Sequence, residues 1–259
     1  MLIEVHEERL LVISDLHLGN PFSLATTRLR SFLDYARSEG FSLCINGDGL
    51  EILQASFTAL ASHSLDILVQ MQRVSEGGGN VYYVVGNHDI TLEHLLNTWL
   101  REHLSPFLNV RSGDQRIRVE HGHLYDPFFV HYPRLYQAVT MAAGPLLHLY
   151  PDVYYLWSRY QGWKQKVREQ RQSDDAEQGS TFYQAAEMLL ARGFDTVIFG
   201  HTHDPEVASL ERGGTYVNSG NWMRSTTFVE IVGGEVTLKR WDKDRALLVE
   251  RAPRLLPGG

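Results

Sequence analysis

Several features on which whole classes of proteins depend are scarce in this sequence of 259 residues. Its single cysteine, Cys44, excludes an internal disulfide framework and any cysteine-rich zinc module. No segment approaches the ~20 consecutive apolar residues that span a bilayer, and the N-terminus lacks the pattern of a signal peptide. Basic residues are in the minority, with 24 Lys+Arg against 31 Asp+Glu, which argues against nucleic acid as the main partner. We therefore expect a cytoplasmic protein that could touch the inner membrane face only peripherally.

What remains is the composition of an ordinary globular protein with one unusual feature. Hydrophobic residues make up 43% and charged residues 21%, which excludes disordered and fibrous classes. The formal net charge is −7, and the chain carries 12 histidines. Composition alone does not explain why the chain has so many histidines. Their positions in the sequence must therefore be considered.

Short apolar runs alternate with helical patterns along most of the chain. This alternation predicts an α/β protein with largely parallel strands. A capping box at Thr181 and Gln184 predicts the start of a helix that stops at Gly193. The predicted buried strands are Leu10–Ile13, Leu43–Ile45, Val81–Val85 and Thr196–Phe199, with helices near 29–36 and 54–74 between them.

The last third of the chain and one central segment break this rhythm. Close-spaced strands are predicted at 215–218, 226–232 and 235–241, with a hairpin turn at Gly233-Gly234. The tail, 251–259, is predicted to be loose. Residues of about 124–179 are aromatic and helical in character, so we interpret them as a helical, cap-like insertion in one domain spanning 1–259.

Metal-competent side chains follow the predicted strands at their carboxyl ends. In an α/β sheet these ends open on a common crevice, so residues distant in sequence can converge there. They are Asp15 and His17 after the first run, Asp48 after the second, Asn87, His88 and Asp89 after the third, His121 after the run 117–119, and His201 and His203 after 196–199.

Seven of these residues (Asp15, His17, Asp48, Asn87, His121, His201 and His203) form a coherent ligand set. Carboxylates, an amide oxygen and imidazoles without thiolates favour Mn, Fe, Zn or Co over Ca or Mg. The set is too large for one tetrahedral ion but suits two ions that share a carboxylate. Such a pair attracts phosphate, lowers the pKa of a bound water and holds the oxygens of an in-line phosphoryl displacement. We expect two divalent ions as cofactors, Mn²⁺ first, with Fe, Zn or Co as alternatives.

The ordered motifs D-x-H, GD, GNH, HG and GHTH, between residues 15 and 203, resemble the calcineurin-like metallophosphoesterase family. The resemblance implies a four-layer α-β-β-α sandwich in which two facing sheets are flanked by helices. It also implies that Asp48 bridges two ions and that His88 is the catalytic acid for the leaving oxygen. By the same resemblance, one ion is held by Asp15, His17, Asp48 and His203, and the other by Asp48, Asn87, His121 and His201.

A narrower resemblance concerns the substrate. Gly47–Glu51, Ser219–Trp222 and the helical insertion are similar to the bacterial UDP-diacylglucosamine pyrophosphohydrolases of lipid A synthesis. Those enzymes cleave a pyrophosphate within a UDP-linked acylated sugar, and their insertion caps the acyl chains. The chain departs from many of them at His88, where they have Arg, so this resemblance leaves the substrate open.

Further residues are candidates for supporting or substrate-binding roles. Glu51 and Asp89 are expected to orient the ligands, whereas His123, Asn218 and Asn221 either line the site or serve local hydrogen bonds and turns. Within the insertion, residues 154–172 carry a formal charge of +4, which favours a pyrophosphate or an anionic membrane surface. An equally open alternative is that the insertion packs on itself with its basic face in solvent. The basic candidates are Arg159, Lys164, Lys166 and Arg168.

These patterns predict a binuclear hydrolase of phosphodiester or pyrophosphate bonds. Its expected partner is a phosphate-containing small molecule or a lipid-linked substrate, such as the acylated UDP-sugar. One alternative is a phosphatase or nucleotide phosphodiesterase for soluble substrates, of the dinucleoside polyphosphate type. Another is a non-catalytic scaffold that retains the fold.

Overall fold

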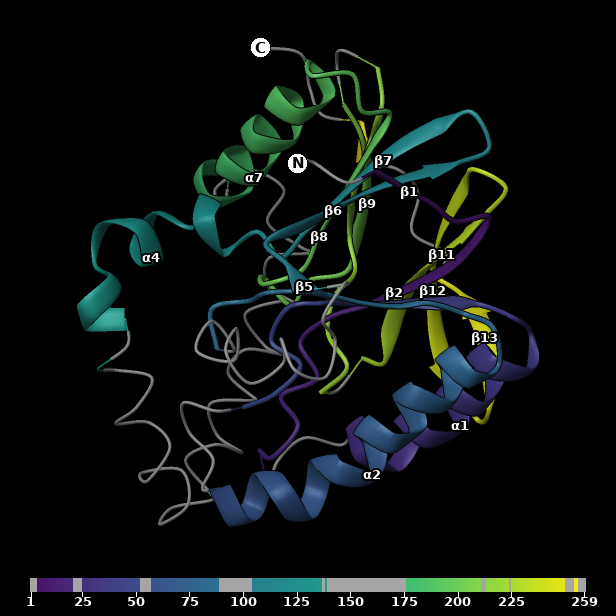
Figure 1. Ribbon diagram of the computed structural model, residues 1–259. Coiled ribbons are helices and arrows are strands. Elements are labelled where there is room, and N and C mark those ends of the chain that lie inside the picture. Colours follow the sequence, from purple (N-terminus) through teal and green to yellow (C-terminus); the bar gives the residue numbers. More distant parts are fainter. Residues whose placement is uncertain are drawn as a thin grey trace.

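The strand-end side chains are positioned by a sandwich of two β-sheets (Figure 1). The computed structural model describes the backbone of most of the chain. In residues 25–27, 57–65, 176–180 and 254–255 it describes the backbone alone. The described residues are 4–20, 25–51, 57–88, 104–136, 138, 176–210, 213–223, 225–249 and 254–255.

The first sheet contains the strands that precede the D-x-H, GD and GNH motifs. Its strands β2 to β5 are mutually parallel, and β11 to β13 extend it by antiparallel pairing. In spatial order it consists of β13 (Arg245–Leu248), β12 (Glu235–Asp242), β11 (Thr227–Val232), β2 (Arg9–Ile13), β3 (Ser42–Asn46), β4 (Val81–Val84) and β5 (Leu104–Ser105).

The second sheet contains the strands that precede the HG and GHTH motifs. Strands β7 and β8 are parallel neighbours, so the loops that follow them leave the sheet at the same edge. In spatial order the sheet consists of β1 (Glu4–His6), β6 (Phe107–Ser112), β7 (Gln115–Glu120), β8 (Thr196–Phe199), β10 (Thr215–Asn218), β9 (Glu206–Ser209) and β14 (Arg254–Leu255).

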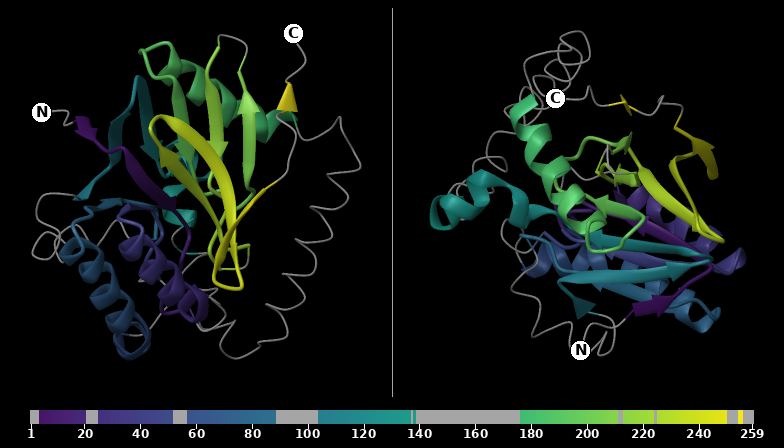
Figure 2. Two further views of the ribbon diagram at one scale, coloured as in Figure 1. Left: turned by 90° about the vertical axis from the view of Figure 1, so that its right-hand side faces the viewer. Right: turned by 90° about the horizontal axis from the view of Figure 1, so that it is seen from above.

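Helices cover the outer faces of both sheets and complete four layers, as Figure 1 shows. Two helices pack side by side on the first sheet, and one helix packs on the second (Figure 2). The described helices are α1 (Ala25–Ser38), α2 (Phe57–Glu76), the 3₁₀ turn η2 (His123–Tyr125), α4 (Pro127–His131) and α7 (Ala176–Leu190). The predicted α/β sandwich is therefore confirmed.

Apolar side chains from facing strands fill the space between the sheets. Val12 and Cys44 of the first sheet belong to the same buried cluster as Val119 and Ile198 of the second. Burial of such side chains stabilises the sandwich by roughly 25 cal/mol per Å² of apolar surface removed from water. Cys44 lies in mid-strand, and burial raises the pKa of its thiol, so it serves as a small core residue.

The predicted strands and helices are found among the described residues with shifted ends, and two differences from the prediction have a clear physical cause. Helix α7 begins at Ala176 rather than at Thr181, because Ala, Glu and Gln before the capping box are good helix formers. The tail predicted to be loose contributes β14, whose Arg254 pairs with Ala208 of β9, since a free sheet edge offers unpaired backbone groups. Most of the insertion, 137 and 139–175, lies outside the described residues. Among the described helices, none is long and apolar enough to cross a membrane.

Candidate metal centre

The loops that follow the central strands have an unusual backbone. Asp15, His17, Asp48, His201 and His203 all have positive φ values, between 46° and 64°. Non-glycine residues seldom adopt this left-handed region, and each instance costs on the order of 1–3 kcal/mol. Such strain persists where the surrounding structure dictates it, and here it coincides with five of the seven predicted ligands.

Two glycines let these loops approach one another closely. A Cβ atom at Gly86 would overlap Oδ1 and the backbone nitrogen of Asp48, and a Cβ at Gly47 would overlap the ring of His121. Gly47 also has φ of +76°, which glycine adopts without steric cost. The glycines of the GD and GNH motifs are therefore required by the packing of one motif against the next.

Asp15, His17 and His203 form what we call the first cluster. Their candidate ligand atoms lie within 4.8 Å of one another. Nε2 of His203 is 2.9 Å from Oδ1 of Asp15. Asp15 and His17 are buried, whereas 39% of the His203 side chain is exposed, so this cluster opens toward solvent on the His203 side.

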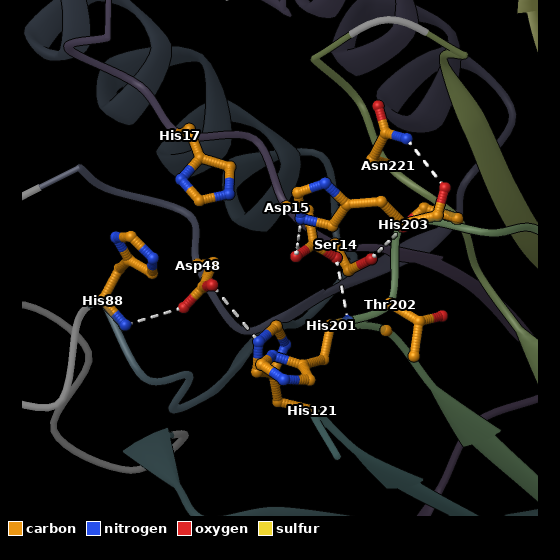
Figure 3. Close-up of polar contacts among 12 residues, drawn as sticks. Ser14, Asp15, His17, Asp48, His88, His121, His201, Thr202, His203 and Asn221 are labelled. Atoms are coloured by element: carbon orange, nitrogen blue, oxygen red, sulfur yellow. Dashed lines mark hydrogen bonds and ion pairs between the residues drawn. The ribbon is translucent and has the colours of Figure 1, made fainter. Parts of the chain in front are cut away.

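Asp48, His121 and His201 form the second cluster, again with ligand atoms within 4.8 Å of one another. Oδ2 of Asp48 is 3.3 Å from Nε2 of His121. Oδ1 of Asn87 lies between the two imidazoles, 3.2 Å from Nε2 of His121 and 3.0 Å from Nδ1 of His201. The division into two clusters follows the two ligand sets that the family resemblance implies, and Figure 3 shows the side chains gathered around Asp15 and Asp48.

A single buried carboxylate, Glu51, supports the first cluster from behind. Its Oε2 is 2.7 Å from Nδ1 of His17, and its Oε1 is 2.7 Å from Nδ1 of His88. Because Glu51 accepts a hydrogen bond from Nδ1–H of His17, Nε2 of that ring carries the lone pair that a metal requires. Glu51 thus has the geometry of the orienting role predicted for it.

The histidines of the second cluster are supported in the same way. Nδ1 of His121 donates to the backbone oxygen of Asn46 at 2.8 Å, and Nε2 of His201 is 2.9 Å from Oδ2 of Asp126. Tyr136 accepts a hydrogen bond from Nδ2 of Asn87 at 2.9 Å, which turns Oδ1 of Asn87 toward the imidazoles. Sequence reasoning missed Asp126 and Tyr136. The only signal at Asp126 is that of a helix cap, an Asp followed by Pro127.

His88 belongs to neither predicted ligand set, but with His17 and Asp48 it forms a third group whose candidate ligand atoms lie within 4.8 Å of one another. Its backbone nitrogen donates to Oδ1 of Asp48 at 2.9 Å. Its ring packs edge-on against that of His17, with centroids 4.9 Å apart. Because Glu51 occupies Nδ1, the remaining nitrogen, Nε2, is the one free to exchange a proton with a bound molecule.

Mutual charge sets the ionisation of these buried groups before a metal binds. Burial opposes the charge on each of them, but His121 and His88 hold the pKa of Asp48 well below its usual range. Burial likewise lowers the pKa of His121, but the charge of Asp48 outweighs it and raises the pKa to about 10. For His17, the hydrogen bond to Glu51 overcomes burial and raises the pKa to about 9. Protons on these imidazoles thus take the place that a cation would fill.

The remaining predicted site residues lie around the clusters or outside the described part. His123 is buried, and its ring centroid is 5.5 Å from that of His121. Within the part of the chain that the structure describes, its Nδ1 has no hydrogen-bond partner. Asn218 donates to the oxygen of Gly200, and Asn221 donates to that of His203 at 3.0 Å, so both brace the GHTH loop. Asp89, Arg159, Lys164, Lys166 and Arg168 lie outside the described residues.

The residues present fit divalent cations. In the second cluster, Oδ1 of Asn87 and the nitrogens of His121 and His201 that face it are all lone-pair donors when the rings are neutral. Converging lone pairs repel one another unless a proton or a metal ion lies between them. In the first cluster, the buried Nε2 of His17 has no hydrogen-bond partner among the described residues. Nitrogen and oxygen donors of this kind bind Mn, Fe, Zn or Co.

Fold and site together define a class: a two-sheet α/β sandwich with groups of Asp and His that could hold metal at the carboxyl ends of its strands. The sequence matches the calcineurin-like phosphoesterase family over residues 8–205. The chain therefore belongs to this family.

Solved structures are similar to this chain at low sequence identity. Vacuolar protein sorting 29 from Cryptosporidium parvum is 14% identical, with 94% of this chain and 96% of that chain covered and a TM-score of 0.50. A predicted phosphoesterase from Streptococcus pneumoniae is 13% identical, with 94% of each chain covered and a TM-score of 0.43. At these identities the likeness concerns the fold alone. No curated protein matches the sequence.

Proposed function

We propose that this protein is a hydrolase of phosphodiester or pyrophosphate bonds that works with two divalent metal ions, Mn²⁺ first among them. The observation that carries the proposal is the convergence of two ligand clusters beside His88, with Glu51 hydrogen-bonded to both His17 and His88. The ions, when bound, activate water as Lewis acids and neutralise charge on the phosphoryl group.

The protein's own residues have separable roles in this proposal. Asp48 belongs to the second cluster and also holds the backbone of His88, so it ties the ligands to the proton donor. His88 donates a proton from Nε2 to the leaving oxygen, because its Nδ1 is engaged by Glu51. Glu51 keeps the rings of His17 and His88 in fixed orientations.

The substrate class that we propose is a nucleoside diphosphate-linked acylated sugar, whose pyrophosphate is split into two phosphomonoesters. The motif resemblance to the UDP-diacylglucosamine enzymes supports it. So does an apolar surface on the segment that contacts the clusters: Leu124, Phe128, Val130 and Leu135 are each 45–58% exposed. Exposed apolar side chains beside a polar site suit a substrate with a charged head and an apolar tail. The same surface is a place for peripheral contact with a membrane.

A substrate panel read by phosphorus NMR tests both levels of the proposal. Protein supplied with Mn²⁺ is given acylated UDP-sugar, its deacylated analogue, dinucleoside polyphosphates and simple phosphodiesters. We expect cleavage of the pyrophosphate in the acylated UDP-sugar at a rate well above that for the deacylated analogue. Asp48→Ala serves as the inactive control, and Asp34→Ala, an exposed change on α1, serves as the active one.

The other outcomes select the alternatives. Equal rates on acylated and deacylated UDP-sugar would remove the acyl-chain proposal and leave a pyrophosphatase for soluble substrates. A preference for dinucleoside polyphosphates would favour a soluble nucleotide hydrolase. No hydrolysis of any compound by metal-loaded protein would refute the catalytic proposal and favour a scaffold.

A further inference from the structure

A short segment, residues 123–136, contacts the second cluster at His201 and the neighbouring Asn87. Asp126 contacts Nε2 of His201 at 2.9 Å, and the hydroxyl of Tyr136 accepts from Nδ2 of Asn87 at 2.9 Å. In the same segment, the ring of His123 packs edge-on against that of Phe129, with centroids 5.0 Å apart. Both contacts engage the ligand side chains at the atoms that face away from the cluster.

The carboxylate of Asp126 uses its two oxygens for different partners. Oδ1 accepts from the backbone nitrogen of Phe128 at 2.9 Å and caps the start of α4. Oδ2 contacts His201. The side chains of His201 and Asp126 are only 10% and 14% exposed, so water competes little for either bond. One residue therefore joins the beginning of a helix to a candidate ligand.

These contacts decide which atoms the ligands present. A neutral imidazole carries one N–H and one lone pair, and an acceptor at Nε2 places the lone pair on Nδ1. Nδ1 of His201 is the nitrogen that faces Asn87 Oδ1, at 3.0 Å. Tyr136 orients Asn87 in a similar way. Its hydroxyl accepts a hydrogen bond from Nδ2 of Asn87, so Oδ1 of Asn87 faces the cluster.

We propose that Asp126 and Tyr136 are positioning residues that present the lone pairs of His201 and Asn87 to a divalent ion, and that they couple the order of segment 123–136 to that ion. The inference rests on the proposed function only in requiring that the second cluster binds metal. Coupling of this kind is reciprocal: metal binding orders the segment as much as the segment favours binding.

Asp126→Asn is the sharpest substitution because it keeps the shape and the helix cap. If its amide oxygen still accepts from Phe128, its NH₂ group faces Nε2 of His201. That nitrogen must then become the acceptor, which moves the proton to Nδ1 and blocks the metal. Asp195→Asn is the matched control, since Oδ2 of Asp195 also accepts a backbone N–H, from Arg116 at 2.8 Å.

Calorimetric titration of metal-free protein with Mn²⁺ alone measures the effect. We expect wild type and Asp195→Asn to bind two ions, and Asp126→Asn to bind one of them about 10- to 100-fold more weakly. Tyr136→Phe should weaken the same ion by a smaller factor. Unchanged affinity for both ions in Asp126→Asn would overturn the inference while leaving the proposed function intact. Wild type that binds no Mn²⁺ would overturn both.

Two further measurements separate positioning from simple loss of structure. Imidazole ¹⁵N shifts of the metal-free protein in mildly alkaline buffer should show His201 protonated at Nε2 in wild type and at Nδ1 in Asp126→Asn. Amide exchange of Phe128, Val130 and Tyr132 should slow when Mn²⁺ is added to wild type, and much less so in the variant. Two results would contradict the proposed coupling. One is the same His201 tautomer in both proteins, and the other is amide exchange in wild type that does not change when Mn²⁺ is added.

Discussion

The two clusters of the site are built alike but supported differently. In the first cluster, His17 is held by Glu51, which follows β3 of the same sheet, and His203 remains 39% exposed. In the second, His121 is held by the backbone of Asn46, whereas His201 is held by Asp126 at the start of the insertion. Among the described residues, the first cluster is therefore supported from the sandwich, and the second is supported partly from a segment outside it.

This difference indicates how a common fold can be adapted. The sandwich supplies strand ends, strained loops and most of the ligands. A segment inserted between β7 and α7 can still tune one metal position, because it holds the outer nitrogen of a ligand histidine.

Asp48→Ala should prevent both clusters from binding an ion, so that the difference between them can no longer be measured. Asp48 contacts His121 through Oδ2 and the backbone of His88 through Oδ1, and the family resemblance makes it the shared ligand. We expect metal content to fall from two ions to none, measured by elemental analysis, and hydrolysis to fall to background. Asp34→Ala should retain both. Two bound ions in Asp48→Ala would show that it is not the bridge.

His88→Ala should leave both clusters loaded and remove the proton donor that lies beside them. We expect kcat to fall by about 10²- to 10⁴-fold, the usual contribution of general acid catalysis, with the Mn²⁺ stoichiometry unchanged. His6→Ala, an exposed change on β1, should match wild type in steady-state kinetics. Full activity in His88→Ala would refute the acid assignment.

Glu51→Gln should weaken the first cluster selectively. An amide cannot accept hydrogen bonds from both His17 and His88, so one ring loses its orientation. We expect one Mn²⁺ to bind about 10- to 100-fold more weakly, as in Asp126→Asn. The informative comparison is between these two single variants and the variant that carries both substitutions. The double variant should bind both ions more weakly. If both single variants weaken the same ion, the separate support of the clusters is wrong.

Metal binding should release protons near neutral pH. The pKa values of His17 and His121 are raised to about 9 and about 10, so both rings are protonated at neutral pH before a metal binds. A metal ligand must be neutral. The apparent affinity should therefore rise with pH, by about tenfold per unit for each proton released. Titration calorimetry in buffers of different ionisation enthalpy counts these protons, and a count of zero would contradict the raised pKa values.

The same shifts make the metal-free fold less stable at high pH. A histidine whose pKa is raised on folding adds stability that is fully present below its unfolded value, near 6.5, and is lost as pH rises through the folded value. Metal-free protein should thus lose stability between about pH 6.5 and 10, measured by urea unfolding. Loaded protein should not show this loss, because the metal replaces the protons.

The strand-end ligands were predictable, whereas their supports were not. Asp15, His17 and Asp48 follow apolar runs in motifs with glycine, and strand ends meet at one edge of a sheet by topology alone. Glu51 was predictable as an orienting residue because it lies three positions after Asp48. Asp126 and Tyr136 depend on how the insertion folds back on the strand-end loops, and such long-range contacts leave no local periodicity in a sequence.

The edges of the sheets were also harder to predict than their centres. Strands β2, β3 and β8 are continuous apolar runs because they are buried on both faces. Strands β1 and β14 are only two or three residues long and are defined by their pairing with β6 and β9. A short strand of this kind is fixed by the neighbour that it joins rather than by its own residues.

Anomalous diffraction at the manganese edge, from crystals grown with Mn²⁺, would locate the ions of the binuclear centre. We predict two peaks, one among Asp15, His17 and His203 and one among Asp48, His121 and His201, with Asp48 shared. No peak at either cluster, or manganese bound only elsewhere on the protein, would contradict the binuclear centre on which the proposed hydrolysis depends.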